Sequence, residues 1–168
     1  MWTRLGRWRW DNVPVPKIHV GTLLVGAYLQ RYRPWDVTVD GVRWKPLGWG
    51  LVAIGGFVIA RTVQIAGETR MDRPHRVITE GPYAHSRHPM YVAWTLVYLG
   101  VTLVLRTMWL LLALPAVILA THVVALREER ALEERFGDEY REYANRVPRY
   151  LSTHRSTLCP LVTHNLSH

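Results

Sequence analysis

Residues 88–126, HPMYVAWTLVYLGVTLVLRTMWLLLALPAVILATHVVAL, decide the fold class of this chain. Residues 88–105 contain no Lys, Arg, Asp or Glu, and after Arg106 the same is true of residues 107–126. Each run approaches the roughly 20 apolar residues with which a helix crosses a bilayer. Because so little chain separates the two runs, they predict an antiparallel pair of membrane-spanning helices.

Two shorter apolar runs, residues 18–29 and 46–60, precede this pair, and each is followed directly by a polar residue, Gln30 or Arg61. Together the four runs predict an all-α, polytopic membrane protein with about four transmembrane helices. The length of 168 residues fits a single domain. The alternative is a soluble protein built of buried helices, in which charge-free runs of this length would be unusual.

The formal net charge of +8 is explained better by membrane topology than by nucleic-acid binding. With both chain ends in the cytoplasm, 16 of the 21 Lys and Arg residues fall on the inner side and five on the outer side. This distribution follows the positive-inside rule. We therefore expect a lipid bilayer, and no nucleic acid, as a partner. The single cysteine, Cys159, excludes an internal disulfide and a cysteine-rich metal site.

A polar stretch, residues 75–91 (HRVITEGPYAHSRHPMY), lies between the second and third predicted spans. A long segment of this kind without periodicity is usually functional or disordered. Pro89 is favoured at the first position of a helix, which places Arg87 and His88 at a helix N-terminus, where anions bind. The alternative is a basic connector, which is common on the cytoplasmic side. The hairpin that follows brings His88 and Arg127 to the same side of the membrane.

Glu128 and Glu129 follow Arg127 directly, at the inner end of the fourth predicted span. Carboxylates at a membrane boundary are costly without cationic partners. An adjacent pair there indicates a bound cation or a role in proton transfer. The side chains expected across the hairpin are those of Arg87, His88, Tyr83 and His75.

These side chains match the chemistry of S-adenosylmethionine. A carboxylate pair can bind an ammonium group or lie near a sulfonium, and a loop with aromatic, histidine and turn donors can bind a nucleoside. The alternative is a metal ion held by the histidines and carboxylates of this region. Because their spacing matches no zinc pattern of the HExxH kind, we expect no metal. The residues concerned are His75, His85, His88, Glu128 and Glu129.

A charged segment after the fourth span carries Leu132, Phe136, Tyr140 and Tyr143 at helical spacing. This stripe predicts an amphipathic C-terminal helix that lies on the membrane surface or folds over the cytoplasmic ends of the spans. The alternative is a solvated tail helix.

Several spaced elements of the chain occur in an order typical of one family. They are Gly81-Pro82-Tyr83, Arg87-His88-Pro89-Met90-Tyr91, Glu128-Glu129, Phe136-Gly137, Tyr140, Tyr143 and Val147-Pro148-Arg149. In these elements the chain resembles the isoprenylcysteine carboxyl methyltransferase family, whose superfamily also includes phospholipid N-methyltransferases. The resemblance covers residues 75–149, whereas residues 1–67 match only as two apolar spans.

The resemblance implies an integral membrane methyltransferase that uses S-adenosylmethionine in a cytoplasmic pocket closed by the C-terminal helix. The lipidic or small hydrophobic acceptor would enter from the bilayer. The domain would then comprise N-terminal spans (1–67), a cofactor-binding motif region (68–150) and a tail (151–168). The matching positions imply cofactor binding by His75, Arg76, Val77, Ile78, Tyr83, His88, Pro89, Met90, Tyr91 and Glu128.

The chain departs from the prenylcysteine branch at Val124, where that branch has an arginine on the substrate side; the nearest arginine here is Arg127. We therefore expect an acceptor other than a prenylcysteine carboxylate. An amine or thiol acceptor must lose a proton, so Glu129 is a candidate base, with Arg127 as the second candidate catalytic residue. The alternative role of Glu129 is an ion pair with a neighbouring arginine: Arg87, Arg127 or Arg130.

Two other functions remain open from the sequence. One is a nicotinamide-dependent membrane reductase of the sterol-reductase type, and the other is a non-enzymatic membrane subunit.

Overall fold

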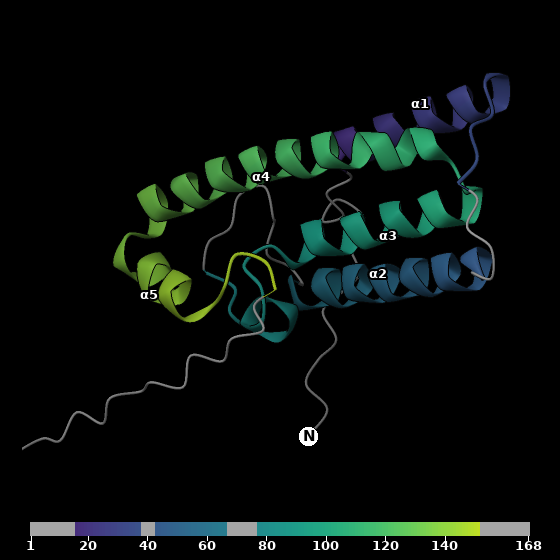
Figure 1. Ribbon diagram of the computed structural model, residues 1–168. Coiled ribbons are helices and arrows are strands. Elements are labelled where there is room, and N and C mark those ends of the chain that lie inside the picture. Colours follow the sequence, from purple (N-terminus) through teal and green to yellow (C-terminus); the bar gives the residue numbers. More distant parts are fainter. Residues whose placement is uncertain (1–15, 38–42, 67–76, 152–168) are drawn as a thin grey trace, which may run out of the picture.

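The computed structural model describes residues 16–37, 43–66 and 77–151 (Figure 1). Apart from one isolated bridge between Asp36 and Thr107, the regular structure in these ranges is helical, which confirms the predicted all-α class. The elements are α1 (Lys17–Tyr32), α2 (Trp44–Ala66), the 3-10 helix η2 (Gly81–Ala84), α3 (Pro89–Leu105), α4 (Met108–Phe136) and α5 (Asp138–Arg146).

Helices α2 and α3 lie against each other along their length (Figure 1). Their contact depends on small residues: a Cβ atom at Gly48 would lie 2.6 Å from the carbonyl oxygen of Gly100, and one at Gly55 would lie 2.7 Å from that of Ala93. Small residues are common where membrane helices approach closely. A Cβ atom at Gly50 or Gly56 would meet open space, so two of these four α2 glycines, Gly48 and Gly55, serve packing.

Helix α4 is joined to the rest of the bundle by α1 and α3. Helix α1 runs beside the N-terminal half of α4 (Figure 1), where Gly26 faces Leu110. From α3, the buried Tyr98 donates a hydrogen bond of 3.0 Å to the carbonyl oxygen of Leu110. Tyr98, Leu110 and Val117 form a buried cluster that ties the three helices together.

The α3–α4 turn lies at the end of the bundle opposite to α5 and η2 (Figure 1). Arg106 takes a left-handed conformation there, with φ 52°. The chain after α1 meets this turn: Met108 N–H donates to the Trp35 carbonyl at 2.9 Å, and Val37 N–H to the Arg106 carbonyl at 2.8 Å. The predicted tight hairpin is therefore present, and the α1–α2 connection begins beside it.

By length and apolarity, α2 with 23 residues and α4 with 29 residues could each cross a membrane. Helix α3 is apolar but has 17 residues, and α1 has 16. The apolar part of α4 ends at Leu126, and its last ten residues are mostly charged.

The charged segment after Leu126 does not form one continuous helix. Gly137 has φ 54° and ψ −122°, a conformation that side chains with a Cβ strongly disfavour, and the chain turns there from α4 into α5. The stripe residues then meet across this turn. Tyr140, Tyr143 and Val147 form a buried cluster against Leu132, Phe136 and Val77.

Candidate functional site

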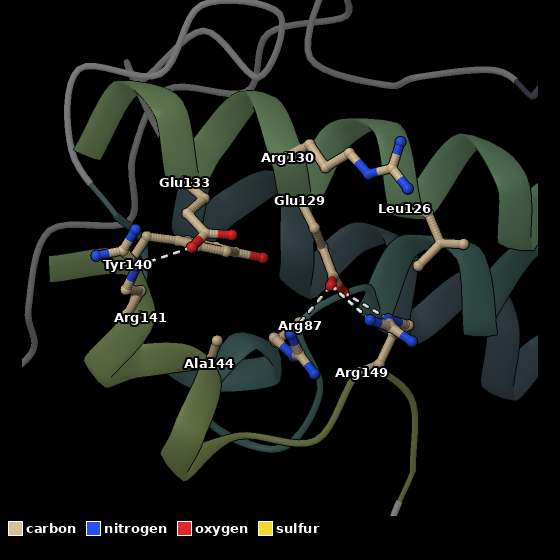
Figure 2. Close-up of a pocket in the computed structure, with 9 residues that line it drawn as sticks. All are labelled: Arg87, Leu126, Glu129, Arg130, Glu133, Tyr140, Arg141, Ala144 and Arg149. Carbon is tan, nitrogen blue, oxygen red and sulfur yellow. Dashed lines mark hydrogen bonds and ion pairs between the residues drawn. The ribbon is translucent and has the colours of Figure 1, made fainter. Parts of the chain in front are cut away.

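The carboxylate of Glu129 lies at the centre of a polar cluster near the end of α4 that faces α5 (Figure 2). It is 10% exposed and takes two hydrogen bonds of 2.8 Å from Arg149. Arg87 Nη1 and His88 Nε2 each lie 3.1 Å from one of its oxygens. The predicted meeting of the 75–91 stretch with the end of the fourth span is thus confirmed by direct contacts.

The backbone holds these partners in register. His88 is the N-cap of α3, and Pro89 takes the first helical position, as predicted. Two N–H groups pair with the chain after α5: Arg87 N–H donates to the Pro148 carbonyl at 2.9 Å, and His88 N–H to the Arg149 carbonyl at 3.2 Å. The residues after α5 therefore form one wall of the site.

Glu128 lies beside this cluster and is half exposed. One of its oxygens accepts a hydrogen bond of 2.6 Å from the Tyr91 hydroxyl, and the other lies 3.7 Å from His88 Nδ1. The His88 and Tyr91 rings are stacked, with centroids 5.5 Å apart. Glu128 thus keeps an exposed edge from which it can bind a cation.

Of the two buried titratable groups in this cluster, Glu129 is charged and His88 is neutral at neutral pH. Burial alone would raise the pKa of Glu129, but the hydrogen bonds of Arg149 and the charges of Arg87, Arg149 and His88 outweigh it and lower the pKa. Burial lowers the pKa of His88, and the nearby Arg87 and Arg149 add to this, although Glu129 opposes it. A neutral His88 that donates through Nε2 to the Glu129 carboxylate has an unprotonated Nδ1 facing Glu128.

A cavity of about 220 Å³ opens between α4, α5 and the Glu129 cluster (Figure 2). Two buried polar atoms at this cavity, Arg87 Nε and the Tyr140 hydroxyl, make no well-aligned hydrogen bond to any described residue. The Tyr140 ring reaches from α5 toward Glu129 (Figure 2). These donors suit an anionic group such as a carboxylate. The lining residues are Arg87, Leu126, Glu129, Arg130, Glu133, Tyr140, Arg141, Ala144 and Arg149.

Of the other residues expected to bind a cofactor, the structure describes Val77, Ile78, Tyr83, Pro89 and Met90. Val77 packs on the Tyr140–Tyr143 cluster, and the Tyr83 carbonyl accepts a hydrogen bond of 2.8 Å from the Tyr143 hydroxyl. Ile78 is half-buried, and Pro89 and Met90 are buried in the first turn of α3. His75 and Arg76 lie outside the described residues.

Arg127 is exposed and, within the described ranges, takes part in no ion pair, so the structure does not bring it to the cluster. Its catalytic role remains a prediction. The strongest partner of Glu129 is Arg149, which sequence reasoning did not select as a site residue. Its place in the Val147-Pro148-Arg149 element, one of the elements in which the sequence resembles the family, was the available signal.

Comparison with known proteins identifies the family of this chain. A model of the phospholipid methyltransferase family matches residues 44–139, more than half of the chain. The chain belongs to the phospholipid methyltransferase family. The matched region contains Arg87, His88, Glu128 and Glu129, whereas Arg149 lies beyond it.

One curated relative supports the same assignment. The protein-S-isoprenylcysteine O-methyltransferase of Schizosaccharomyces pombe is 27% identical over 107 residues, which cover 59% of this chain and 45% of that protein. The chain thus spans less than half the length of this methyltransferase relative. No solved structure matched the chain at a significant level.

Proposed function

We propose that this protein is an integral membrane methyltransferase that transfers a methyl group from S-adenosylmethionine to a lipidic or small hydrophobic acceptor. The observation that carries the proposal is the cluster of Arg87, His88, Glu128 and Glu129 beside a cavity lined by arginine and tyrosine side chains, in a chain of the phospholipid methyltransferase family. The relative's name, a methyltransferase acting on an isoprenylcysteine, supports the same reaction class.

In this proposal all four long helices cross the bilayer, with the site on the cytoplasmic side. At about 1.5 Å per residue, α1 and α3 would span about 24 and 26 Å, slightly less than the roughly 30 Å hydrocarbon core. The contact between the α1–α2 connection and the α3–α4 turn supports their placement on one side of the membrane. The distribution of Lys and Arg residues assigns that side to the outside. The α5 helix would then cover the cytoplasmic end of the site.

The site residues fit S-adenosylmethionine by their chemistry. The exposed edge of Glu128 can accept hydrogen bonds from an ammonium group, and the cavity beside Arg87 and Tyr140 offers donors for a carboxylate. When bound, the cofactor supplies a methyl group on positively charged sulfur, which needs alignment more than acid–base activation.

Glu129 fits the ion-pair role better than the role of a base. Its two oxygens accept hydrogen bonds from Arg87, His88 and Arg149. Burial raises the pKa of Glu129, but these partners lower it by more, so the pKa lies below its ordinary value. A carboxylate engaged in this way takes up a proton with difficulty. We therefore assign Glu129 to holding Arg87, His88 and Arg149 in place around the cofactor.

Titration of the purified protein in nanodiscs with S-adenosylmethionine tests the proposal. We expect binding, and we expect Glu128→Gln to weaken it about tenfold or more, since a hydrogen bond to a charged group contributes about 1.5–3 kcal/mol. Glu134→Gln, an exposed carboxylate on the same helix, is the matched control. Absence of binding, or equal affinity in the Glu128 and Glu134 variants, would contradict the assignment, and binding of NADPH instead would favour a reductase.

A further inference from the structure

His122 lies on α4 in the apolar part of the helix, six and seven residues before the two glutamates. It is half-buried, and its Nδ1 atom lies 3.0 Å from the Tyr150 hydroxyl. Ionisable side chains at membrane depth are costly and usually have a function. The cluster around Glu129 makes no use of this histidine.

Tyr150 connects His122 with the site. Its ring lies 6.0 Å from the His122 ring and 6.3 Å from the His88 ring, measured between centroids. The residue before it, Arg149, binds Glu129, which lies two turns along α4 from His122 on the same face. Arg149 and Tyr150 therefore contact α4 at two places, Glu129 and His122, which lie about 10 Å apart along the helix.

We infer that His122 is the base that removes a proton from the methyl acceptor, and that Tyr150 is the positioning residue that holds its ring. This inference rests on the proposed function. It also restricts the acceptor to a class: a hydrophobic amine or thiol, which must lose a proton, and not a carboxylate.

The Nδ1 atom of His122 lies 3.0 Å from the Tyr150 hydroxyl, and either group can be the donor of this hydrogen bond. The inference requires the tautomer in which Nδ1–H donates to the hydroxyl oxygen, because Nε2 then carries the lone pair. Nε2 makes no hydrogen bond to a described residue, and the half-buried ring belongs to the apolar part of α4.

The proton and electrons balance in a single step. The N–H or S–H bond of the acceptor breaks, and its proton goes to His122 Nε2. The lone pair of the acceptor forms the new bond to the methyl carbon as the bond from that carbon to sulfur breaks, and this electron pair leaves with the sulfur as a neutral thioether.

Methyl transfer in nanodiscs to phosphatidylethanolamine, dodecanethiol and a prenylcysteine analogue tests the acceptor class. His122→Gln keeps a hydrogen-bonding side chain beside Tyr150 but removes the base. We expect it to lower turnover of the amine or thiol by at least about 100-fold, the usual contribution of a general base, with unchanged affinity for S-adenosylmethionine. His85→Ala, an exposed histidine that bonds only to the Gly81 carbonyl within the described residues, should leave turnover unchanged.

A turnover with His122→Gln close to that of the unchanged protein, or efficient methylation of the prenylcysteine analogue alone, would overturn this inference. Either result could occur with S-adenosylmethionine still bound, so the proposed function would survive it.

The tautomer provides a test that needs no turnover. In protein with 15N-labelled histidine, NMR should show His122 protonated at Nδ1 and unprotonated at Nε2, and Tyr150→Phe should remove this preference. His122 protonated at Nε2 in the unchanged protein would exclude it as the base.

Discussion

Glu129 is a single buried carboxylate shared by three side chains, and its removal should affect stability more than its one charge suggests. Glu129→Gln leaves Arg87 and Arg149 without a counter-charge in a mostly buried position. Breaking a buried ion pair by removing one partner typically costs about 3–5 kcal/mol. Because Arg149 is one-third exposed, we expect a loss near the lower limit, about 3 kcal/mol in the free energy of unfolding, measured by denaturant unfolding in micelles.

The control for this substitution is Glu133→Gln, one turn along the same helix. Glu133 pairs with Arg141 at 2.8 Å, but both side chains are largely exposed, so the pair should contribute little. Equal losses in the two variants would show that Glu129 is not the centre of a buried network.

The buried neutral His88 should make the protein less stable on mild acidification. Burial first, and then Arg87 and Arg149, hold its pKa below the ordinary 6.5 against the effect of Glu129, so below pH 6.5 the unfolded chain binds a proton that the folded chain does not. Stability is therefore lost as the pH falls from 6.5 toward the folded pKa. The carboxylate of Glu129, with its pKa below the ordinary 4.5, stays charged through this range.

Comparison with His88→Asn isolates this effect. Between about pH 7.5 and pH 5, the unchanged protein should lose more unfolding free energy than the variant. Parallel losses in both proteins would mean that His88 takes up its proton over the same pH range in the folded and unfolded chains.

Helices α2 and α3 should separate if a methyl group is added at their contact. Gly55 and Gly56 are adjacent, yet a Cβ at Gly55 would lie 2.7 Å from the Ala93 carbonyl oxygen and from a Val97 methyl group, whereas one at Gly56 meets open space. We expect Gly55→Ala to cost about 1–3 kcal/mol by overpacking, and Gly56→Ala to be neutral or slightly stabilising. Thermal unfolding of the two variants in the same detergent checks this, and similar midpoints would contradict the observed helix contact.

The sequence predicted these helices well because their apolar runs are long and nearly free of charge. It also predicted that residues 75–91 meet the end of α4, since a tight hairpin leaves few other arrangements. The break at Gly137 was not predicted: the apolar spacing of Leu132, Phe136, Tyr140 and Tyr143 continues through it, and one glycine need not interrupt a helix. The pairing of Arg149 with Glu129 depends on that break, because the turn at Gly137 is what returns the chain to α3.

In the molecule as a whole, the polar residues of the candidate site lie at one end of an apolar helical bundle. The Glu129 cluster, the cavity and α5 lie at that end, and the α3–α4 turn lies at the other (Figure 1). Because α4 continues about three turns past its apolar part, it can cross the bilayer and still supply Glu128 and Glu129 to a site outside the hydrocarbon region. An acceptor in the membrane and a soluble cofactor could then meet at the boundary.

This arrangement predicts where cysteine probes react. On a Cys159→Ser background, Lys45→Cys and Arg106→Cys should react with a membrane-impermeant maleimide from the outer side, and Glu142→Cys from the cytoplasmic side. All three positions are exposed. If only α2 and α4 crossed the membrane, Lys45 and Glu142 would share a side and Arg106 would lie on the opposite one. That pattern would contradict the four-helix topology. It would place the α3–α4 turn and the start of α2 on opposite sides of the bilayer, although Gly48 near the start of α2 lies against Gly100 and Val104 near the end of α3.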